Sequence, residues 1–177
     1  MQNTYSFFIF CVIMFLLGGC MIKIDGNNPT GHEYFENIFC LDNFSAFSVV
    51  VDGVEYKTAE HAFQTIKFLM TNKKVAEEIR CSSSPFEARR LAHKYKSFRR
   101  EDWSDVKYDI MEKILYEKAI QNEYVKEKLL ATKNNKIVED CGEDDDKDWG
   151  CGLDGTGENN LGKIWMKIRE KLLKVTL

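Results

Sequence analysis

Hydrophobic residues recur at helical spacing in three stretches of the second half of the chain. The first stretch predicts a long helix from about residue 104 to 121, and the second predicts a shorter helix after it. The third predicts an amphipathic core helix at the C-terminal end. The apolar positions are, in order, Val106, Ile110, Ile114 and Leu115; Val125, Leu129 and Leu130; and Leu161, Trp165, Ile168, Leu172 and Val175.

The first half of the chain carries the pattern of a β-hairpin. Residues 48–51 and 54–57 are rich in residues that favour strands, and Asp52-Gly53 between them suits the two positive-φ positions of a tight turn. Thr58 follows the hairpin as the expected N-cap of a helix from Ala59 to about Met70.

Ser84, Pro85 and Glu87 predict the start of another helix, which runs to about Lys94. Serine is a preferred N-cap and proline suits the first helical position. Glutamate at the third position completes the pattern of a capping box.

Two further segments complete the predicted domain. Ile137-Val138-Glu139 predicts a short strand, and residues 141–160, rich in Gly and Asp without an apolar period, predict a loop. Together the elements predict an α+β fold: a predominantly α-helical single domain with a small β-hairpin or sheet, spanning residues 34–177.

An apolar leader precedes this domain. Phe7 to Leu17 is an uninterrupted apolar run with the length of a signal-peptide core, and Leu17-Gly18-Gly19-Cys20 resembles a bacterial lipoprotein processing box. No Lys or Arg precedes the run, although signal peptides normally carry positive charge there. Residues 1–20 are therefore either an exported or lipid-anchored segment or sequence upstream of a start at Met21. We exclude them from the domain on both interpretations.

Composition narrows the functional classes. The 177 residues include 25 basic and 28 acidic side chains, and this balance argues against a protein whose main role is to coat nucleic acid. A hydrophobic content of 44% is enough to bury a core. Six cysteines occur singly, without a C-x-x-C pair, so the sequence indicates neither a disulfide scaffold nor a zinc site.

Glu60, Gln64 and Lys67 form the first candidate site. They share one face of the predicted helix, and Glu60 lies in the first turn, where the helix dipole favours an ionised carboxylate. The three groups can hold a polyhydroxyl ligand, stabilise a cation or, through the lysine, form an imine with an aldehyde. The alternative is a surface stripe with an ordinary Glu60–Lys67 salt bridge. His61 points away from this face and is expected to be structural.

The second candidate is the basic segment that contains Arg99, Arg100 and Trp103. Clustered guanidinium groups beside an indole can clamp a phosphate and stack on a base or sugar. The alternative is a solvated basic face, with Trp103 anchoring the next helix in the core.

The third candidate is the acidic, glycine-rich loop, which contains Asp146, Trp149, Gly150, Gly152 and Asn159. Glycines at this density let the backbone approach a ligand, and the loop opens onto a helix N-terminus suited to anions. The spacing of its acidic residues does not fit an EF-hand, and the chain has neither a P-loop nor a dinucleotide-binding glycine motif. The alternative is an acidic surface loop.

These segments, in this order, resemble the NADAR superfamily. The resemblance covers nearly everything from Tyr34 onward, and the blocks around Glu60 and Trp149 are specific when they occur together. The matching residues are Asn43-Phe44-Ser45, Asp52-Gly53, Thr58-x-Glu60-His61-x-Phe63-Gln64-x-x-Lys67-Phe68, Arg100-x-Asp102-Trp103, Trp149-Gly150-x-Gly152 and Gly157-x-Asn159-x-Leu161-Gly162.

The resemblance implies an N-glycosidase that hydrolyses the bond between a ribose and a base-like amine. Members of the family act on phosphoribosylated aminopyrimidine intermediates of riboflavin biosynthesis, releasing ribose 5-phosphate, and some relatives remove ADP-ribose from guanine. It also implies that Glu60, Trp103, Asp146 and Trp149 occupy functional positions, with Lys67 and Arg100 in the same pocket.

Two positions depart from the family pattern. Ala92-His93 stands where Gly-Arg is common, and Ala119 replaces a usual phenylalanine. The first departure can alter a phosphate contact, so the reaction class follows more firmly from the resemblance than the substrate does.

Two chemical schemes fit the matched residues. In the first, Glu60 stabilises the cation at the anomeric carbon or activates water, while Asp146 protonates the leaving nitrogen. In the second, Lys67 forms a Schiff base with the opened sugar. The other expected contacts are Trp103 and Trp149 with the pyrimidine, and Arg100, Lys96 or the helix N-terminus near Leu161 with the 5′-phosphate.

Neither scheme needs a metal or an organic cofactor. The expected partner is a phosphoribosylated aminopyrimidine in the cytoplasm, and ADP-ribosylated nucleic acid is the alternative substrate. A membrane partner is expected only if the leader is retained as an anchor ending at Cys20. A non-catalytic module that binds ADP-ribose or a nucleotide is the alternative from another functional class.

Overall fold

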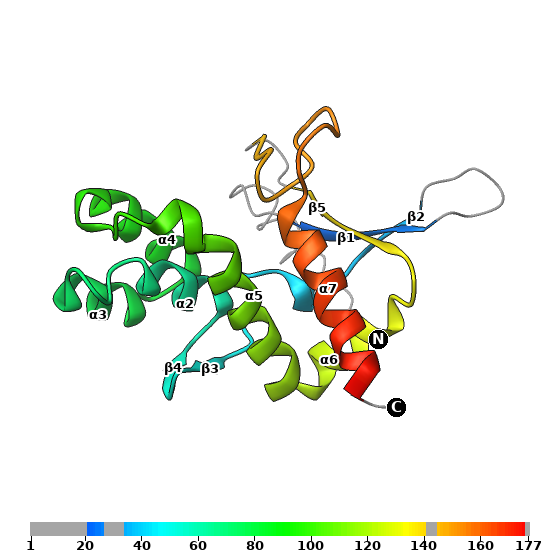
Figure 1. Ribbon diagram of the computed structural model, residues 1–177, viewed down its shortest axis with the longest axis horizontal. Helices are drawn as coiled ribbons and strands as arrows, with labels where there is room; N and C mark the ends of the chain where they lie inside the picture. The colour runs from blue at the N-terminus through cyan, green and yellow to red at the C-terminus, as the bar shows by residue number, and fades with distance from the viewer. Residues whose placement is uncertain (1–20, 27–33, 141–144, 176–177) are drawn as a thin grey trace, which may run out of the picture. The chain divides into compact units, whose positions relative to one another are not determined.

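The computed structural model describes residues 21–26, 34–140 and 145–175 (Figure 1). The chain divides into two compact units. The sheet unit comprises the described residues up to Phe39 together with those from Asn134 to Lys163. The helical unit comprises residues 40–133 and the chain from Ile164 onward. Both interpretations of the leader, including acylation of Cys20, concern residues outside the described ranges.

A three-stranded antiparallel sheet forms the sheet unit, with strand order β2-β1-β5. The strands are β1 (Met21–Gly26), β2 (Tyr34–Asn37) and β5 (Lys136–Asp140). The strand predicted at residues 137–139 is therefore confirmed, whereas β1 and β2 were not predicted. Ile22 of β1 and Ile137 of β5 are fully buried. Strand β1 lies before residue 34, where we expected the fold to begin, so the folded part of the chain includes Met21–Gly26.

The predicted β-hairpin opens the helical unit. Strands β3 (Val49–Val51) and β4 (Val54–Tyr56) pair antiparallel. The turn between them has φ of 52° at Asp52 and 76° at Gly53, the left-handed conformation that an Asp-Gly turn favours. Val49, Val51 and Tyr56 turn inward and are buried, as the alternation of a half-buried hairpin requires.

Helix α2 (Ala59–Ile66) begins at the predicted cap, since Thr58 Oγ1 accepts the backbone N–H of His61 at 3.2 Å. It ends earlier than predicted, because tighter turns follow, with Phe68 N–H bonded to the carbonyl of Thr65. Helix α3 (Lys73–Arg80) then begins at Asn72, whose side chain accepts the N–H of Val75. This eight-residue helix was not predicted.

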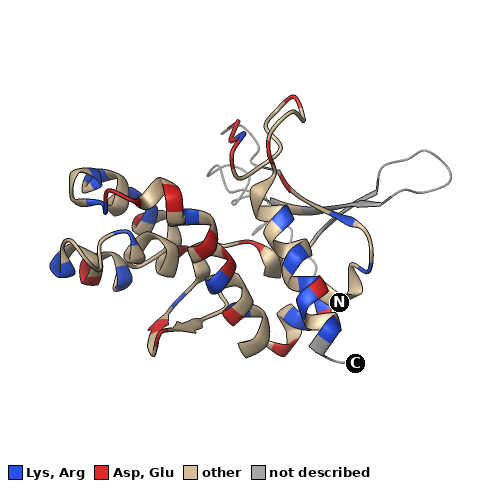
Figure 2. Ribbon diagram, in the orientation of Figure 1, with Lys and Arg blue, Asp and Glu red and all other residues tan. Residues whose placement is uncertain are grey.

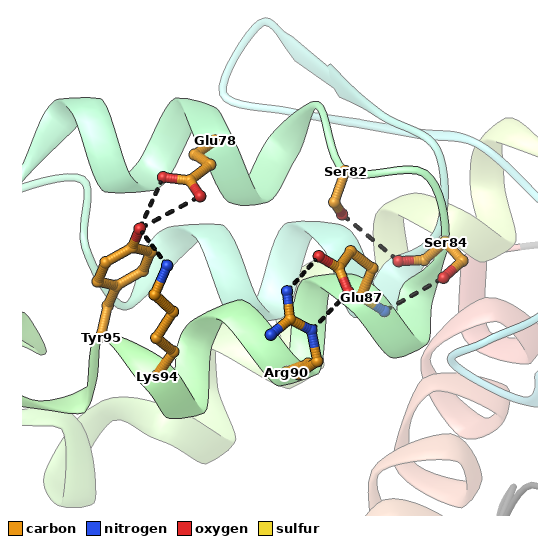
Figure 3. Close-up of polar contacts among 7 residues, drawn as sticks. All are labelled: Glu78, Ser82, Ser84, Glu87, Arg90, Lys94 and Tyr95. Atoms are coloured by element: carbon orange, nitrogen blue, oxygen red, sulfur yellow. Dashed lines mark hydrogen bonds and ion pairs between the residues drawn. The ribbon is translucent and has the colours of Figure 1, made fainter.

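Helix α4 (Pro85–Lys94) begins at Ser84 as predicted, with Ser84 Oγ accepting the N–H of Glu87. The carboxylate of Glu87 instead accepts two N–H groups of Arg90, each at 2.7 Å, so only the serine half of the capping box is present (Figure 3). Across the pair of helices, the Tyr95 hydroxyl lies between Glu78 of α3 and Lys94 of α4 (Figure 3). Apolar residues of α3 and α4 form a buried cluster with Phe68: Val75, Ala76, Ile79, Ala88, Leu91 and Ala92.

Three later helices match the three stretches with helical apolar spacing. They are α5 (Trp103–Gln121), α6 (Glu123–Ala131) and α7 (Asn160–Val175), and the boundary between the two units falls within α7. Figure 2 shows Lys and Arg along α7. Four residues of its apolar stripe, Leu161, Trp165, Ile168 and Leu172, are buried, and Trp165 Nε1 donates to the carbonyl of Leu41. No helix in the described ranges is both long enough and apolar enough to cross a membrane. The predominantly helical α+β fold is confirmed.

Candidate functional site

The polar side chains of α2 form a continuous hydrogen-bonded row. Gln64 Nε2 donates to Glu60 Oε1 at 2.7 Å, and Lys67 Nζ donates to Gln64 Oε1 at 2.6 Å. The predicted common face is therefore confirmed. Glu60 and Gln64 are only 5% and 6% exposed, so the row is not a surface stripe. The amide of Gln64 stands between the carboxylate and the amine, in place of the direct Glu60–Lys67 salt bridge that we considered.

The start of α2 is fixed by hydrogen bonds that do not involve the side chains of Glu60, Gln64 and Lys67. The backbone N–H of Glu60 donates to the carbonyl of Asn43 at 3.0 Å. The ring of His61 lies within hydrogen-bond distance of Thr58 Oγ1 and of the carbonyl of Ser82, at 2.9 and 3.3 Å. Because both ring nitrogens face structural partners, His61 anchors the helix, as expected.

Burial sets the proton affinities of the row. Removal from water raises the pKa of Glu60 above its ordinary value, and the N–H of Gln64 and the charge of Lys67 oppose this shift. Burial likewise lowers the pKa of Lys67 to about 8, and the charge of Glu60 opposes it. The value of about 8 also includes the positive charges of Arg99, Arg89 and Lys107, which lower the pKa in the same direction as burial. The amine is thus available in its neutral form far more often than that of an ordinary lysine.

Two aromatic rings flank the Lys67 amine. Its Nζ lies 4.9 Å from the centroid of Phe63 and 5.1 Å from that of Trp103. The two rings pack on each other at 4.9 Å with a 60° tilt. Trp103 is 5% exposed and begins α5, so it anchors that helix and also encloses the amine. Its stacking on a pyrimidine stays a prediction.

The backbone of Arg100 is hydrogen-bonded to the end of the row at Lys67, but its side chain bonds elsewhere. Its N–H donates to the carbonyl of Lys67 at 3.0 Å. Its guanidinium forms a two-point bond with Asp102, at 2.5 and 2.7 Å. A phosphate would have to compete with this carboxylate. The charges of Arg99, a member of the second candidate cluster, and of Arg89 lower the pKa of Lys67.

The remaining predicted residues lie in the sheet unit, on the loop between β5 and α7. Asp146 Oδ1 accepts the backbone N–H groups of Asp148 and Trp149, both at 2.9 Å, so its carboxylate shapes the turn. The carbonyl of Trp149 accepts the N–H of Leu161 at the start of α7. These bonds hold the loop against the helix N-terminus, and the proposed acid role of Asp146 stays a prediction.

Asn159 ties the same loop to the sheet, and two glycines form hydrogen bonds within the loop. The Asn159 side chain accepts the N–H of Glu139 and donates to the carbonyl of Ile137, both at 2.9 Å, so β5 uses both ends of its amide. The carbonyl of Gly150 accepts the Asn159 N–H, and that of Gly152 accepts the N–H of Gly155. This geometry is structural, and it gives no support to substrate binding by Asn159.

The sites on the two units differ in chemistry. The helical unit brings Glu60, Gln64, Lys67 and Trp103 together, while the sheet unit supplies the ordered loop with Asp146 and Trp149. Within the described ranges, no cluster of three or more His, Cys, Asp or Glu residues is arranged to hold a metal ion.

Comparison with known proteins identifies the family. The model of the NADAR domain matches residues 27–173. N-glycosidase YbiA of Escherichia coli (strain K12) is 41% identical over 132 residues, which cover 75% of this chain and 80% of that protein. N-glycosidase Npun_R5314 of Nostoc punctiforme is 31% identical, with 75% and 85% covered. Riboflavin biosynthesis protein VVA0006 of Vibrio vulnificus is 35% identical over 80% of this chain and 37% of its own length.

The fold agrees with a solved relative. The NMR structure of Escherichia coli YbiA superimposes with a TM-score of 0.70 at 39% sequence identity, covering 77% of this chain and 79% of that one. The chain is thus homologous to N-glycosidases in both sequence and structure. The resemblance seen in the motifs is confirmed, and this protein belongs to the NADAR domain family.

Proposed function

We propose that this protein hydrolyses the N-glycosidic bond of phosphoribosylated aminopyrimidine intermediates of riboflavin biosynthesis and releases ribose 5-phosphate. The names of its relatives support the reaction and the pathway. The observation that carries the proposal is the buried row in which Gln64 links the Glu60 carboxylate to the Lys67 amine. The carboxylate can stabilise the cation at the anomeric carbon, and the partly neutral amine on the same helical face can act as a nucleophile.

The carboxylate can act on the anomeric carbon. As the C–N bond breaks, positive charge builds on that carbon, and an ionised Glu60 stabilises it or takes a proton from the attacking water. Water contributes its oxygen to the sugar and the leaving nitrogen gains a proton, so the reaction consumes one water. Glu60 is suited to this because its oxygen is already oriented by the Gln64 amide.

The amine offers a covalent alternative on the same row. Neutral Lys67 attacks the anomeric carbon of the opened sugar, the base leaves with a proton, and water then hydrolyses the imine to return the lysine. The pKa of about 8 favours this scheme, since roughly a tenth of the amine is then neutral at pH 7. Phe63 and Trp103 exclude water from one side of the amine.

The decisive test is turnover by the purified protein. We expect free ribose 5-phosphate from a phosphoribosylated aminopyrimidine, and a rate of release lower by roughly 100-fold or more from a Glu60→Gln preparation at the same concentration. A parallel reaction with ADP-ribosylated guanosine tests the alternative substrate. Binding of either compound without product would show a non-catalytic module. Since the riboflavin intermediates are cytosolic, we also propose that the protein acts in the cytoplasm, which fractionation of native cells would test.

A further inference from the structure

Asn43 carries a buried amide that the fold does not satisfy. The residue is 9% exposed, in the loop between the 3-10 turn Phe39–Leu41 and β3. Among the described residues its Oδ1 has no hydrogen-bond partner. Its Nδ2 donates to the thioether sulfur of Met111 at 3.6 Å, a weak acceptor. Buried amide groups are normally paired, so such an exception calls for a ligand, a water or a functional role.

The location of Asn43 connects it to the candidate site. Its carbonyl accepts the N–H of Glu60 at 3.0 Å, so the residue lies against the first turn of α2. Met111, which its side chain contacts, belongs to α5, the helix that Trp103 begins. Asn43 is thus held between the same two helices that supply the carboxylate and the aromatic wall of the row.

The segment around Asn43 is fixed by hydrogen bonds of the neighbouring residues. Asp42 Oδ1 accepts the N–H of Phe44 at 2.7 Å, and Ser45 Oγ donates to the carbonyl of Asp42 at 2.6 Å. The fully buried Lys118 donates to that carbonyl and to Ser45 Oγ, at 2.7 and 2.8 Å. These bonds fix the chain on both sides of Asn43, whereas the amide oxygen of Asn43 has no partner among the described residues.

We propose that Asn43 is a substrate-binding residue whose side-chain oxygen accepts a hydrogen bond from a hydroxyl of the ribosyl group bound at Glu60. The inference rests on the proposed function. An amide oxygen needs a donor, and a ribosyl hydroxyl supplies one within two bonds of the anomeric carbon, whereas an ionised phosphate offers none. Because this oxygen is unpaired in the free protein, a ligand whose hydroxyl bonds to it should bind more tightly than an analogue that lacks the hydroxyl.

The test compares stability with binding in Asn43→Leu, which keeps the size of the side chain and removes its polar atoms. We expect the melting temperature to stay the same or rise, because an unpaired buried group is replaced by an apolar one. We expect KM to rise about tenfold, equivalent to 1.4 kcal/mol. A lower melting temperature with unchanged KM would overturn the proposal, because it would make Asn43 purely structural.

Asn159→Leu is the matched control, since Asn159 is also buried, at 6% exposure, but has both ends of its amide bonded to the backbone. We expect that variant to lose stability. A direct measurement needs no variant: the side-chain NH2 signals of Asn43 in 15N-labelled wild-type protein should shift when ribose 5-phosphate is added. Signals that do not move would also overturn the inference.

These measurements separate the inference from the proposed function. Wild-type protein that turns over its substrate, with an unchanged KM in Asn43→Leu, would sink only the role of Asn43. Wild-type protein that binds ribose 5-phosphate through Asn43 without any turnover would sink only the enzymatic proposal.

Discussion

The reactivity of the Lys67 amine tests the electrostatics of the site without assuming a substrate. With a pKa of about 8, roughly a quarter of the amine is neutral at pH 7.5. An ordinary lysine with a pKa of about 10.4 is neutral in roughly one molecule in 800. The neutral fraction of the Lys67 amine is therefore on the order of 200 times that of an ordinary lysine. Each unit of pKa difference corresponds to about 1.4 kcal/mol.

Reductive methylation with formaldehyde and cyanoborohydride measures this property, because only the neutral amine reacts. The initial rate at Lys67, followed by peptide mass spectrometry from pH 6 to 11, should reach half of its maximum near pH 8. The position of the midpoint is the readout, since partial burial of Lys67 slows the reaction at every pH without moving it.

Two charge variants should move this midpoint in opposite directions. Arg99→Gln removes a cation that lowers the Lys67 pKa, so the midpoint should rise by about half a unit at low salt. Glu60→Gln removes the anion that raises it, so the midpoint should fall. Lys96→Gln, an exposed cation of the same segment that is not among the charges acting on Lys67, is the control. A wild-type midpoint near 10.4, or an upward shift in Glu60→Gln, would refute the electrostatic account.

The remaining predictions concern activity and stability. Glu60→Gln should lower kcat by roughly 100-fold or more while the melting temperature changes little, and near-wild-type turnover would remove this carboxylate from the mechanism. Burial lowers the pKa of Lys118 to about 8, so the unfolded chain binds more protons between pH 8 and about 10.4. The melting temperature of the wild type should therefore rise relative to that of Lys118→Met across this window, and parallel curves would contradict the argument. Gly162→Ala should cost about 2 kcal/mol or more of unfolding free energy, because a Cβ would collide with the carbonyl of Ile137 and lie 2.6 Å from the Asn159 amide. Gly155→Ala, where a Cβ meets no atom within 4 Å, should cost about 1–2 kcal/mol through its positive φ alone, and equal losses in chemical denaturation would argue against the packing explanation.

The sequence predicted those structural features that depend only on neighbouring residues. The Asp52-Gly53 turn and the caps at Thr58 and Ser84 depend on neighbouring residues only, and each is present in the structure. Long apolar stripes likewise predicted α5, within one residue of its observed start, and the presence of α7. Helix α3 was missed because eight residues contain too few turns to show a period.

Elements that depend on partners far away in the sequence could not be predicted from local sequence patterns. Strand β1 is defined by pairing with β5, more than a hundred positions later, and nothing in its own six residues requires a sheet. The row on α2 was predictable from helical spacing, but its burial and the placement of Gln64 between the two charges were not. The amide of Asn43 could be recognised as unpaired only after the whole chain had been folded around it.

The pairing of β1 with β5 also orders events during synthesis. Met21 pairs with Asp140, 119 positions later, and the helical hairpin of α3 and α4 lies between them. Strand β1 therefore leaves the ribosome long before β5 has been synthesised. Helices stabilised by local contacts can form in that interval. During that interval the edge of β1 that β5 will cover is open to other strands. Nascent chains stalled before residue 136 should consequently be the most prone to aggregate, and release of β5 should end that vulnerability.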